Sequence, residues 1–539
     1  MQTIGVSHDK ESGLIRVLSR VTIAFAAGLA LLFLFTALRR LRYPFELDRM
    51  ESAMMTTVWR IAHGLPIYDR PSLEWVPFLY APVFFYCSAA VAKITGLGYA
   101  ALRLVSILAT LGSCGVIFAM IYRETRHLAA AAAGAGLFIG LYGVTLSWYD
   151  IGRVDSLSVF FFLAALYCTR FASPVLAALV WLLAFQTKQS FLPIAVLAFL
   201  TEWPRPRRMV TGLLTFGVLA YGSVWLLNHH TAGWYSYYVF GTVGELHLSL
   251  RYAALYIPID LIQPLGVALA FIVLALLVAP PDWRSRAAIF YGAMTLVILG
   301  GIGFARAHEG SYVNTLIPAY AWLCVLFGLA IVRVLGVLES SASTSIAPAA
   351  AQNNLSRAMQ ATVWIFVLAQ LSMHLYRPGE FDPGAGTLAT RNHFLDQLRH
   401  IPGDVWVVNH SYDSILAGKG MHAEMDALDA VLGRPDPTVA NEIRQAYATH
   451  RFTTVMLDRA PDSYSPEWLF NGSEFSRHFP LVAFAPSAPI PNSGDQPVMM
   501  YLSCDTPSPL AHSLEMDSTF VKQGICPVST TDTTKGVGH

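Results

Sequence analysis

Charged residues are scarce in this sequence. Only 13% of its 539 residues are Asp, Glu, Lys or Arg, whereas about a quarter of the residues of a soluble protein are charged. The mean hydropathy is +0.48, and 55% of the residues are hydrophobic. This composition excludes an ordinary soluble protein and predicts a polytopic α-helical membrane protein. The formal net charge of +1 argues neither for nor against a nucleic-acid partner, and none is predicted.

Cysteines are also few. The six cysteines include no CxxC pair and no Cys/His spacing typical of zinc sites, so no metal or other cofactor is predicted. Four of them lie in apolar runs, as small core residues do. Cys504 and Cys526 are the pair in a polar C-terminal region. In an oxidising compartment a disulfide between them would contribute about 3 kcal/mol.

An internal repeat of 20–50 residues is missing, and so is a short N-terminal apolar segment followed by a small-residue cleavage site. Transporters are expected to show repeat symmetry, so the missing repeat counts against transport. The first apolar run is expected to be a retained helix that follows a cytoplasmic N-terminus.

Nine apolar runs have the length and composition of transmembrane helices. They cover residues 17–38, 101–122, 128–148, 155–170, 209–227, 255–279, 287–304, 315–334 and 361–376.

A further apolar stretch, residues 173–208, is interrupted by the sequence QTKQS. It forms either one helix with Lys188 in the middle of the membrane or two short helices that meet at QTKQS. Basic residues at both ends prefer the cytoplasm and favour the hairpin; they are Arg170, Arg205, Arg207 and Arg208. Each arm would be roughly 20 Å long, against a hydrocarbon core of ~30 Å, so the tip would line a cavity within the membrane.

With this hairpin the chain makes about eleven passes. The expected external segments are residues 39–100, 228–254 and 304–314 and everything after about residue 377. The basic sequence LRRLR at 38–42 opposes this sidedness. We interpret its arginines as ligands of anionic lipid or phosphate, the alternative being a different topology at that point.

The first external loop is expected to contain amphipathic interface helices. Residues 51–65 place Met54, Val58, Ile61 and Leu65 on one stripe of a helix that would lie flat on the membrane. Residues 78–96 are more apolar. They form either a second surface segment or a full span, which would change the sidedness of everything after them.

After the last apolar run the composition becomes that of a soluble protein. Buried strands are expected at residues 404–409, 452–458 and 498–503, with helices between them. The sequence therefore predicts a transmembrane catalytic domain over residues 1–376 and an extracytoplasmic soluble α/β domain over residues 377–539.

Candidate catalytic groups gather in the segments that are expected outside. Asp48 and Glu51 follow the first run together with Glu46 and Arg49, and their spacing puts them on one helical face. Lys188 marks a site by default, because an ammonium at membrane depth is costly. The other two clusters comprise Asp150, Arg153 and Asp155, and Arg306, His308, Glu309 and Asn314.

Each cluster also has a simpler structural interpretation. Asp150 and Glu309 are expected to be solvated interface residues. Asp155 is either a functional group or a helix N-cap. The sequence HAEMDALD at 422–429 fits no metal template and is expected at the surface, and the small residues of GAGLFIG at 134–140 indicate close helix packing.

Acids, cations and a lipid-facing cavity on the outer face fit glycosyl transfer from a lipid phosphate. A carboxylate acts as general base on the acceptor hydroxyl, which is a poor nucleophile near neutral pH. Cations neutralise the leaving phosphate. Direct attack opposite the leaving group would invert the anomeric centre.

Seven motifs occur in a characteristic order over about residues 15–330. They are ELDRMES, RIAHGLPIYD, FLYAPVFFY, ALRLVSILATL, GRVDSLS, AFQTKQSFL and EGSYVNTLIPAYA. This order resembles the GT-C superfamily of polyprenyl-phosphate-dependent glycosyltransferases, in particular relatives of protein O-mannosyltransferases and aminoarabinose transferases.

The resemblance implies roles for individual residues. The first-loop acid falls on Asp48 or Glu51 and the second acid on Asp155, as catalytic residues. Many relatives show adjacent acids here, whereas this chain spreads them, so the identity of the base stays open. Expected substrate-binding residues are Tyr80, Arg153, Lys188, Arg306, His308 and Asn314. Some GT-C branches use a divalent metal, but no ligand set for one is recognised.

The sequence thus predicts a glycosyltransferase of the bacterial inner membrane. It would move a hexosyl or pentosyl group from a polyprenyl-phosphate donor to an envelope glycan, lipid or protein on the outer face. The alternatives are a ligase or polymerase that uses a polyprenyl-diphosphate glycan, and a non-catalytic transporter or envelope assembly factor.

Overall fold

The structure is a computed structural model. It describes residues 13–242, 248–308, 310–344, 349–434, 436–459, 461–479, 481–484, 499–503 and 521–522. Cys504, Cys526 and Glu309 lie outside the described residues. The chain divides into two compact units, the first made of residues 1–42, 80–240 and 244–382, and the second of residues 43–79, 241–243 and 383–539.

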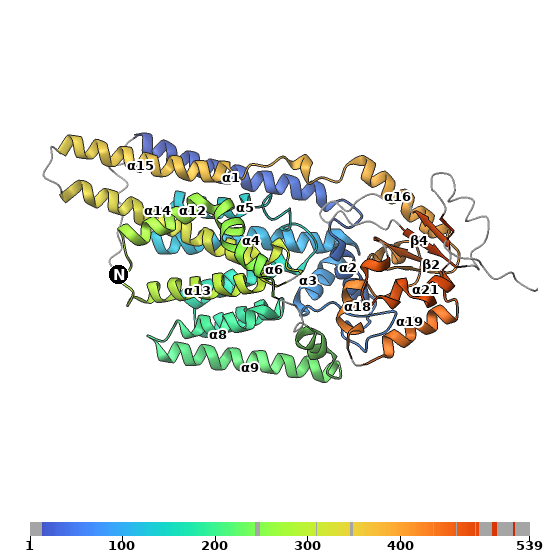
Figure 1. The fold of residues 1–539 in the computed structure, drawn as a ribbon. Helices are drawn as coiled ribbons and strands as arrows, with labels where there is room; N and C mark the ends of the chain where they lie inside the picture. Colours follow the sequence, from blue (N-terminus) through green and yellow to red (C-terminus); the bar gives the residue numbers. More distant parts are fainter. Residues whose placement is uncertain are drawn as a thin grey trace, which may run out of the picture. The chain divides into compact units, whose positions relative to one another are not determined.

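The first unit is built from helices (Figure 1). In its N-terminal half they are α1 (Gly13–Leu41), α3 (Val83–Thr95), α4 (Tyr99–Thr125), α5 (Leu128–Gly140), α6 (Val154–Phe171), α7 (Pro174–Phe185), η2 (Gln189–Phe191), α8 (Leu192–Leu200), α9 (Pro206–His230) and α10 (Trp234–Ser236). They continue with η3 (Tyr237–Gly241), α11 (Leu250–Leu255), η5 (Tyr256–Ile262), α12 (Gln263–Val278), α13 (Arg286–Arg306), η6 (Val313–Leu316), α14 (Ile317–Thr344), α15 (Ala349–Ser372) and η7 (Pro378–Glu380).

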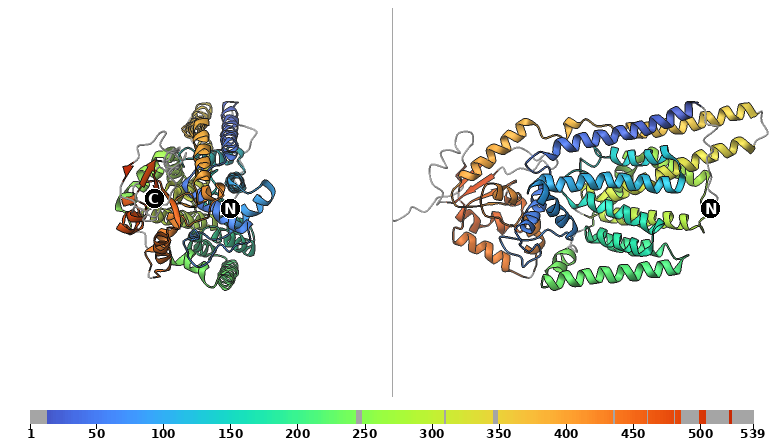
Figure 2. Two further views of the ribbon diagram at one scale, coloured as in Figure 1. Left: turned by 90° about the vertical axis from the view of Figure 1, so that its right-hand side faces the viewer. Right: turned by 180° about the vertical axis from the view of Figure 1, so that it is seen from behind.

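Seven helical segments of the described residues are long and apolar enough to cross a membrane. They are Gly13–Leu41, Tyr99–Thr125, Val154–Phe171, Pro206–His230, Leu250–Val278, Arg286–Arg306 and Val313–Ser340. The chain is therefore a polytopic α-helical membrane protein, as predicted, while the count of about eleven passes stays a prediction. Within this unit α1 packs against α5 and α15. The right-hand view of Figure 2 shows α1 in dark blue alongside α15 in amber.

The apolar stretch after α6 forms two short helices, as the hairpin interpretation predicted. α7 ends at Phe185 and α8 begins at Leu192, so the alternative of one continuous helix through Lys188 is wrong. Pro193 stands in the first turn of α8, where its missing N–H has no intrahelical acceptor to lose. α3 has 13 residues and is about 20 Å long, too short for a full span.

The second unit is an α/β fold. Its helices are α2 (Arg49–Ala62), α16 (Ala385–His400), α17 (Ser411–Leu416), α18 (Met425–Leu432), α19 (Thr438–Ala448), η8 (Pro461–Ser463), α20 (Trp468–Asn471) and α21 (Ser473–His478). Its described strands are β1 (Asp404–Val407), β2 (Phe452–Leu457), β3 (Leu481–Phe484), β4 (Met499–Leu502) and β5 (Val521–Lys522).

The sheet has the order β1-β2-β4-β3-β5, with β1 and β2 parallel and the remaining pairs antiparallel. Its core is formed by Phe394, Leu398, Ile401, Val405, Val407, Met456 and Met500, so α16 covers one face of the sheet. The strands expected near residues 404–409, 452–458 and 498–503 are β1, β2 and β4.

The helix expected over residues 51–65 forms as α2, and half of its predicted apolar stripe is buried in protein. Met54 and Val58 are fully buried, whereas Leu65 lies beyond the helix end and is 41% exposed. α2 belongs to the same compact unit as the C-terminal segment, and α17 packs against it. Amphipathicity alone does not distinguish a membrane surface from a protein partner, and protein covers this half of the stripe.

Candidate active site

Asp155 lies at the centre of a charged cluster in the first unit. Its carboxylate is 1% exposed, and its Oδ1 accepts hydrogen bonds from Lys188 Nζ at 2.8 Å and from Asn314 Nδ2 at 3.0 Å. Arg153 Nε lies 3.4 Å from Oδ2. The N-cap position of α6 is occupied by Arg153, so the interpretation of Asp155 as an N-cap is wrong.

Lys188 reaches this cluster from the tip of the hairpin, where its backbone is extended. Two glutamines hold the tip in place. The amide of Gln186 accepts from the Tyr235 hydroxyl and donates to Ser223, and Gln189 donates to a backbone carbonyl, that of Val239. The two glutamines of QTKQS could have indicated these contacts in the sequence, because polar side chains at membrane depth usually have hydrogen-bond partners.

Arg153 is held by aromatic side chains. Its guanidinium donates to the Tyr80 hydroxyl at 3.3 Å and lies 4.3 Å from the ring centroid of Trp148. The predicted residues Tyr80, Arg153, Asp155, Lys188 and Asn314 therefore come together, although they belong to four separate stretches of chain.

Two of the three charged side chains described in this cluster are cations. Lys188 and Arg153 provide two cations against the one carboxylate of Asp155, and the Lys188 side chain is 21% exposed. Such a site suits an anionic ligand, because charge-assisted hydrogen bonds to phosphate oxygens are strong where water is partly excluded.

Arg306 and His308 take part in other contacts. Arg306 pairs with Asp260 of η5 at 2.9 Å and donates to the Ser311 carbonyl, and its guanidinium lies over the Tyr252 ring. His308 is bound through Nδ1 to the Phe304 carbonyl at 2.9 Å. Their predicted substrate-binding roles stay predictions.

Asp48 and Glu51 lie in the second unit and shape the start of α2. Asp48 is the N-cap residue, and its Oδ1 accepts from the Met50 N–H at 3.1 Å. Glu51 is fully buried, and its Oε2 accepts from the Leu47 N–H at 2.7 Å. The two carboxylates thus sit at one helix N-terminus. The catalytic role predicted for Asp48 or Glu51 stays a prediction.

Glu46, which precedes these two acids in the sequence, is buried among charged groups. Its Oε1 lies 2.9 Å from His410 Nδ1 and 3.0 Å from Arg391. Burial raises the pKa of Glu46, against the opposite effect of these two cations. No signal in the sequence reveals the contacts, because Arg391 is 345 residues away along the chain.

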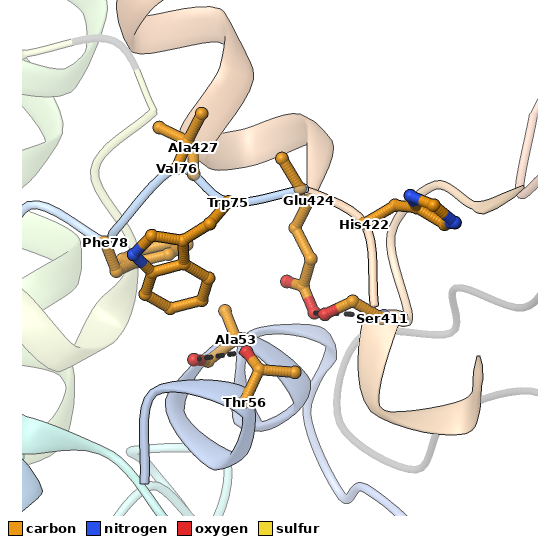
Figure 3. A pocket seen from close by; sticks show the side chains of 10 residues that line it. Ala53, Thr56, Trp75, Val76, Phe78, Ser411, His422, Glu424 and Ala427 are labelled. Carbon is orange, nitrogen blue, oxygen red and sulfur yellow. Dashed lines mark hydrogen bonds between the residues drawn. The ribbon is translucent and has the colours of Figure 1, made fainter. Parts of the chain in front are cut away.

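The sequence HAEMDALD is largely inside the second unit, so the prediction that it lies at the surface is wrong. His422 is 3% exposed and pairs with Asp404 at 2.9 Å. Glu424 accepts hydrogen bonds from the Ser411 hydroxyl and backbone N–H beside a small pocket that also contains the indole of Trp75 (Figure 3). Burial raises the pKa of Glu424 to about 8.

Asp150 is likewise not a solvated interface residue. It is 1% exposed, forms an ion pair with Arg40 at 3.0 Å and accepts from the Tyr142 hydroxyl. Arg40 also donates to Ser147 and to the Phe381 carbonyl, and Arg39 pairs with Asp382. The interpretation of Arg40 in LRRLR as a ligand of lipid or phosphate is therefore wrong, because Asp150, in the segment between α5 and α6, neutralises it.

Within the described ranges, no group of three or more His, Cys, Asp or Glu side chains is arranged to hold a metal ion. The charged groups of the Asp155 cluster are cations and one carboxylate, a set that suits an anion better than a metal.

None of the known protein-family models matches this sequence, and no curated protein matches it. Among solved structures, that of ArnT from Cupriavidus metallidurans bound to undecaprenyl phosphate aligns with a TM-score of 0.56 at 16% identity, over 81% of this chain and 93% of ArnT. ArnT in the apo state aligns with a TM-score of 0.55 at 16% identity, over 88% and 98%.

The Archaeoglobus fulgidus oligosaccharyltransferase in the apo form gives a TM-score of 0.48 at 12% identity, over 94% of this chain and 76% of that enzyme. At that score it supports no argument. The two ArnT structures show the fold: the chain has an ArnT-like architecture.

Proposed function

We propose that this protein is a membrane glycosyltransferase that takes a monosaccharide from a polyprenyl-phosphate donor. The single observation that carries the proposal is the cationic Asp155 cluster within an ArnT-like fold. Lys188 Nζ and the Arg153 guanidinium flank the one buried carboxylate of Asp155. ArnT, the structural neighbour, was crystallised with undecaprenyl phosphate.

In the proposed reaction, the acceptor hydroxyl attacks the anomeric carbon of the sugar. The bond from that carbon to the phosphate oxygen breaks, and its electron pair stays on the phosphate. Lys188 and Arg153 neutralise the negative charge that develops there. Asp48 or Glu51 takes the proton of the acceptor hydroxyl, and the product has inverted configuration.

Asp155 serves this reaction by orienting the cations. Its Oδ1 already accepts two hydrogen bonds and its Oδ2 faces Arg153, so its lone pairs are engaged by partners that hold Lys188 and Arg153 in one place. The acceptor is an envelope glycan, lipid or protein, and transfer takes place on the outer face of the bacterial inner membrane.

The test is transfer from a panel of labelled polyprenyl-phosphate sugars by the purified full chain. Lys188→Met is expected to lower kcat/KM by about 100-fold or more, because a lost charge-assisted contact to a developing anion costs 10²–10³ in rate. Lys93→Met, on an exposed side chain of α3, is the matched control and is expected to stay within about twofold of wild type.

The same assay identifies the base. Asp48→Asn and Glu51→Gln keep the shape of the helix N-terminus, and the variant of the base is expected to lose about 100-fold in kcat. Unchanged turnover in Lys188→Met would contradict the assignment of the phosphate site. Wild-type protein that transfers from no donor of the panel would contradict the proposed activity.

A further inference from the structure

A buried cluster of charged side chains lies directly before Asp48 and Glu51 in the second unit. Its members, here called the Glu46 cluster, are Glu46, Arg391, His410, Asp413 and Asp458, all less than 4% exposed at the side chain. Both ring nitrogens of His410 face carboxylates, Glu46 at 2.9 Å and Asp458 at 3.0 Å. Arg391 joins Glu46 at 3.0 Å to Asp413 at 2.7 Å.

Carboxylates outnumber cations among the five members of this cluster. Three carboxylates face the Arg391 guanidinium and the His410 imidazole. Burial raises the pKa of Glu46, and no hydrogen-bond partner of its Oε2 occurs in the described part of the chain. Although burial opposes its charge, the carboxylates of Asp458 and Glu46 raise the pKa of His410 well above its usual value.

The C-terminal segment also contacts the residues that lie between and directly after Asp48 and Glu51. Ser52, one residue after Glu51, accepts a hydrogen bond from the Tyr412 N–H at 3.1 Å. Arg49, between Asp48 and Glu51, pairs with Asp426 at 3.2 Å. His410 directly precedes α17, and Tyr412 and Asp413 lie in the first turn of α17, so one short stretch, residues 410–413, contacts both ends of residues 46–52.

Stability alone does not account for this arrangement. A buried ion cluster is a weak source of stability, because the desolvation of its charges offsets much of their attraction, and apolar residues of similar volume often serve as well. Such a cluster does fix orientation, since each charged group must meet its partners. Orientation matters at a catalytic base, because a displacement of about 1 Å can cost 10²-fold in rate.

We propose that residues 410–413 position the acid-bearing residues 46–52 for the transfer reaction, with His410 and Arg391 as positioning residues. This inference rests on the proposed function, and it gives the C-terminal segment a direct part in the chemistry through contacts within the second unit.

The test compares His410→Gln with His422→Gln in the full chain. Both substitutions remove a buried histidine of the second unit that pairs with an aspartate, Asp458 for His410 and Asp404 for His422. Of these two histidines, only His410 also contacts Glu46. We expect His410→Gln to lower kcat at least tenfold while KM for the donor stays within twofold. His422→Gln is expected to keep wild-type kcat below its melting temperature.

Hydrogen–deuterium exchange provides a readout without turnover. Backbone amides of residues 46–52 are expected to exchange at least tenfold faster in His410→Gln than in wild type, and to keep the wild-type rate in His422→Gln.

Glu46→Gln keeps an acceptor oxygen for His410 and Arg391, so its loss of kcat should be at least fivefold smaller than that of Glu46→Ala.

Equal exchange at residues 46–52 in the two histidine variants would overturn the proposal, and so would faster exchange in His410→Gln with unchanged kcat. A wild-type protein that transfers from no donor would contradict the proposed function instead. In that case the exchange comparison still decides whether residues 410–413 hold residues 46–52.

Discussion

Two buried acids of this protein, Asp155 and Glu424, differ in the groups that surround them. Asp155 faces two cations and an amide N–H, so its charge is matched, and it can hold Lys188 and Arg153 in place. Glu424 is bonded to Ser411, whose groups are neutral. Burial therefore dominates at Glu424 and raises its pKa to about 8, so this side chain is mostly neutral near pH 7.

Glu424→Gln is expected to stabilise the protein above pH 5. The folded state keeps the proton of Glu424 up to about pH 8, whereas the unfolded state loses it above about 4.5. The contribution of this group to the free energy of unfolding therefore falls as pH rises between these values. The total fall is at most about 5 kcal/mol, because each pKa unit corresponds to roughly 1.4 kcal/mol. Glutamine does not titrate and can still accept from Ser411.

Thermal melting of the full chain in detergent at pH 5, 6.5 and 8 checks this. The melting temperature of Glu424→Gln should exceed that of wild type, and this difference should increase with pH. Glu467→Gln removes a negative charge from an exposed side chain and is the control. A constant difference between Glu424→Gln and wild type across the three values would contradict the expectation.

At the scale of elements, short helices and close contacts position the site. The hairpin of α7 and α8 breaks at QTKQS and presents Lys188, while the N-terminus of α6 presents Arg153 and Asp155. α5 approaches α1 closely through the small residues expected from GAGLFIG. A Cβ placed on Gly136 would lie 2.9 Å from the Ala26 Cα of α1, nearer than real Cβ atoms come to backbone.

Gly136→Ala is therefore expected to lower the free energy of unfolding by about 1–3 kcal/mol, because the added methyl group forces α5 away from α1. Gly115→Ala in α4 is the matched control, since a Cβ there meets nothing within 4 Å and alanine favours a helix. The measurement is thermal melting of the purified variants. A Gly136→Ala protein as stable as Gly115→Ala would show that the two helices separate freely.

At the scale of the whole molecule, an ArnT-like membrane fold is combined with an α/β unit whose sequence is discontinuous. Residues 43–79 of the first loop cluster with residues 383–539 rather than with the helices on either side of them. The acids Asp48 and Glu51 thus belong to the same unit as the C-terminal sheet, and the cations Arg153 and Lys188 belong to the other.

The predicted sidedness places residues 202–208 in the cytoplasm and the C-terminal segment outside, because the basic residues of EWPRPRR favour the inner side. In a variant with the native cysteines replaced by serine, Gln445→Cys of α19 should react with a membrane-impermeant maleimide in intact spheroplasts. Arg207→Cys should react only after lysis. Both side chains are exposed, so accessibility to the reagent reports sidedness. The reverse pattern would contradict the topology.

Much of the membrane fold follows from the sequence alone. Apolar runs mark α1, α4 and α6 within a few residues, because a helix in hydrocarbon must satisfy its own backbone and needs about 20 apolar residues to do so. The basic ends of the hairpin and the polar QTKQS were enough to predict its break. Composition also separated the α/β segment, where alternation and length indicated β1, β2 and β4.

Only the tertiary structure decided which charges meet. Asp150 with Arg40, Glu46 with His410, and Asp155 with Lys188 and Asn314 are contacts between residues far apart in the chain. Local patterns describe a residue's own helix or strand, whereas burial and ion pairing depend on which elements pack together. The same limit explains the stripe of α2, whose apolar spacing indicates a buried face without showing whether lipid or protein covers it.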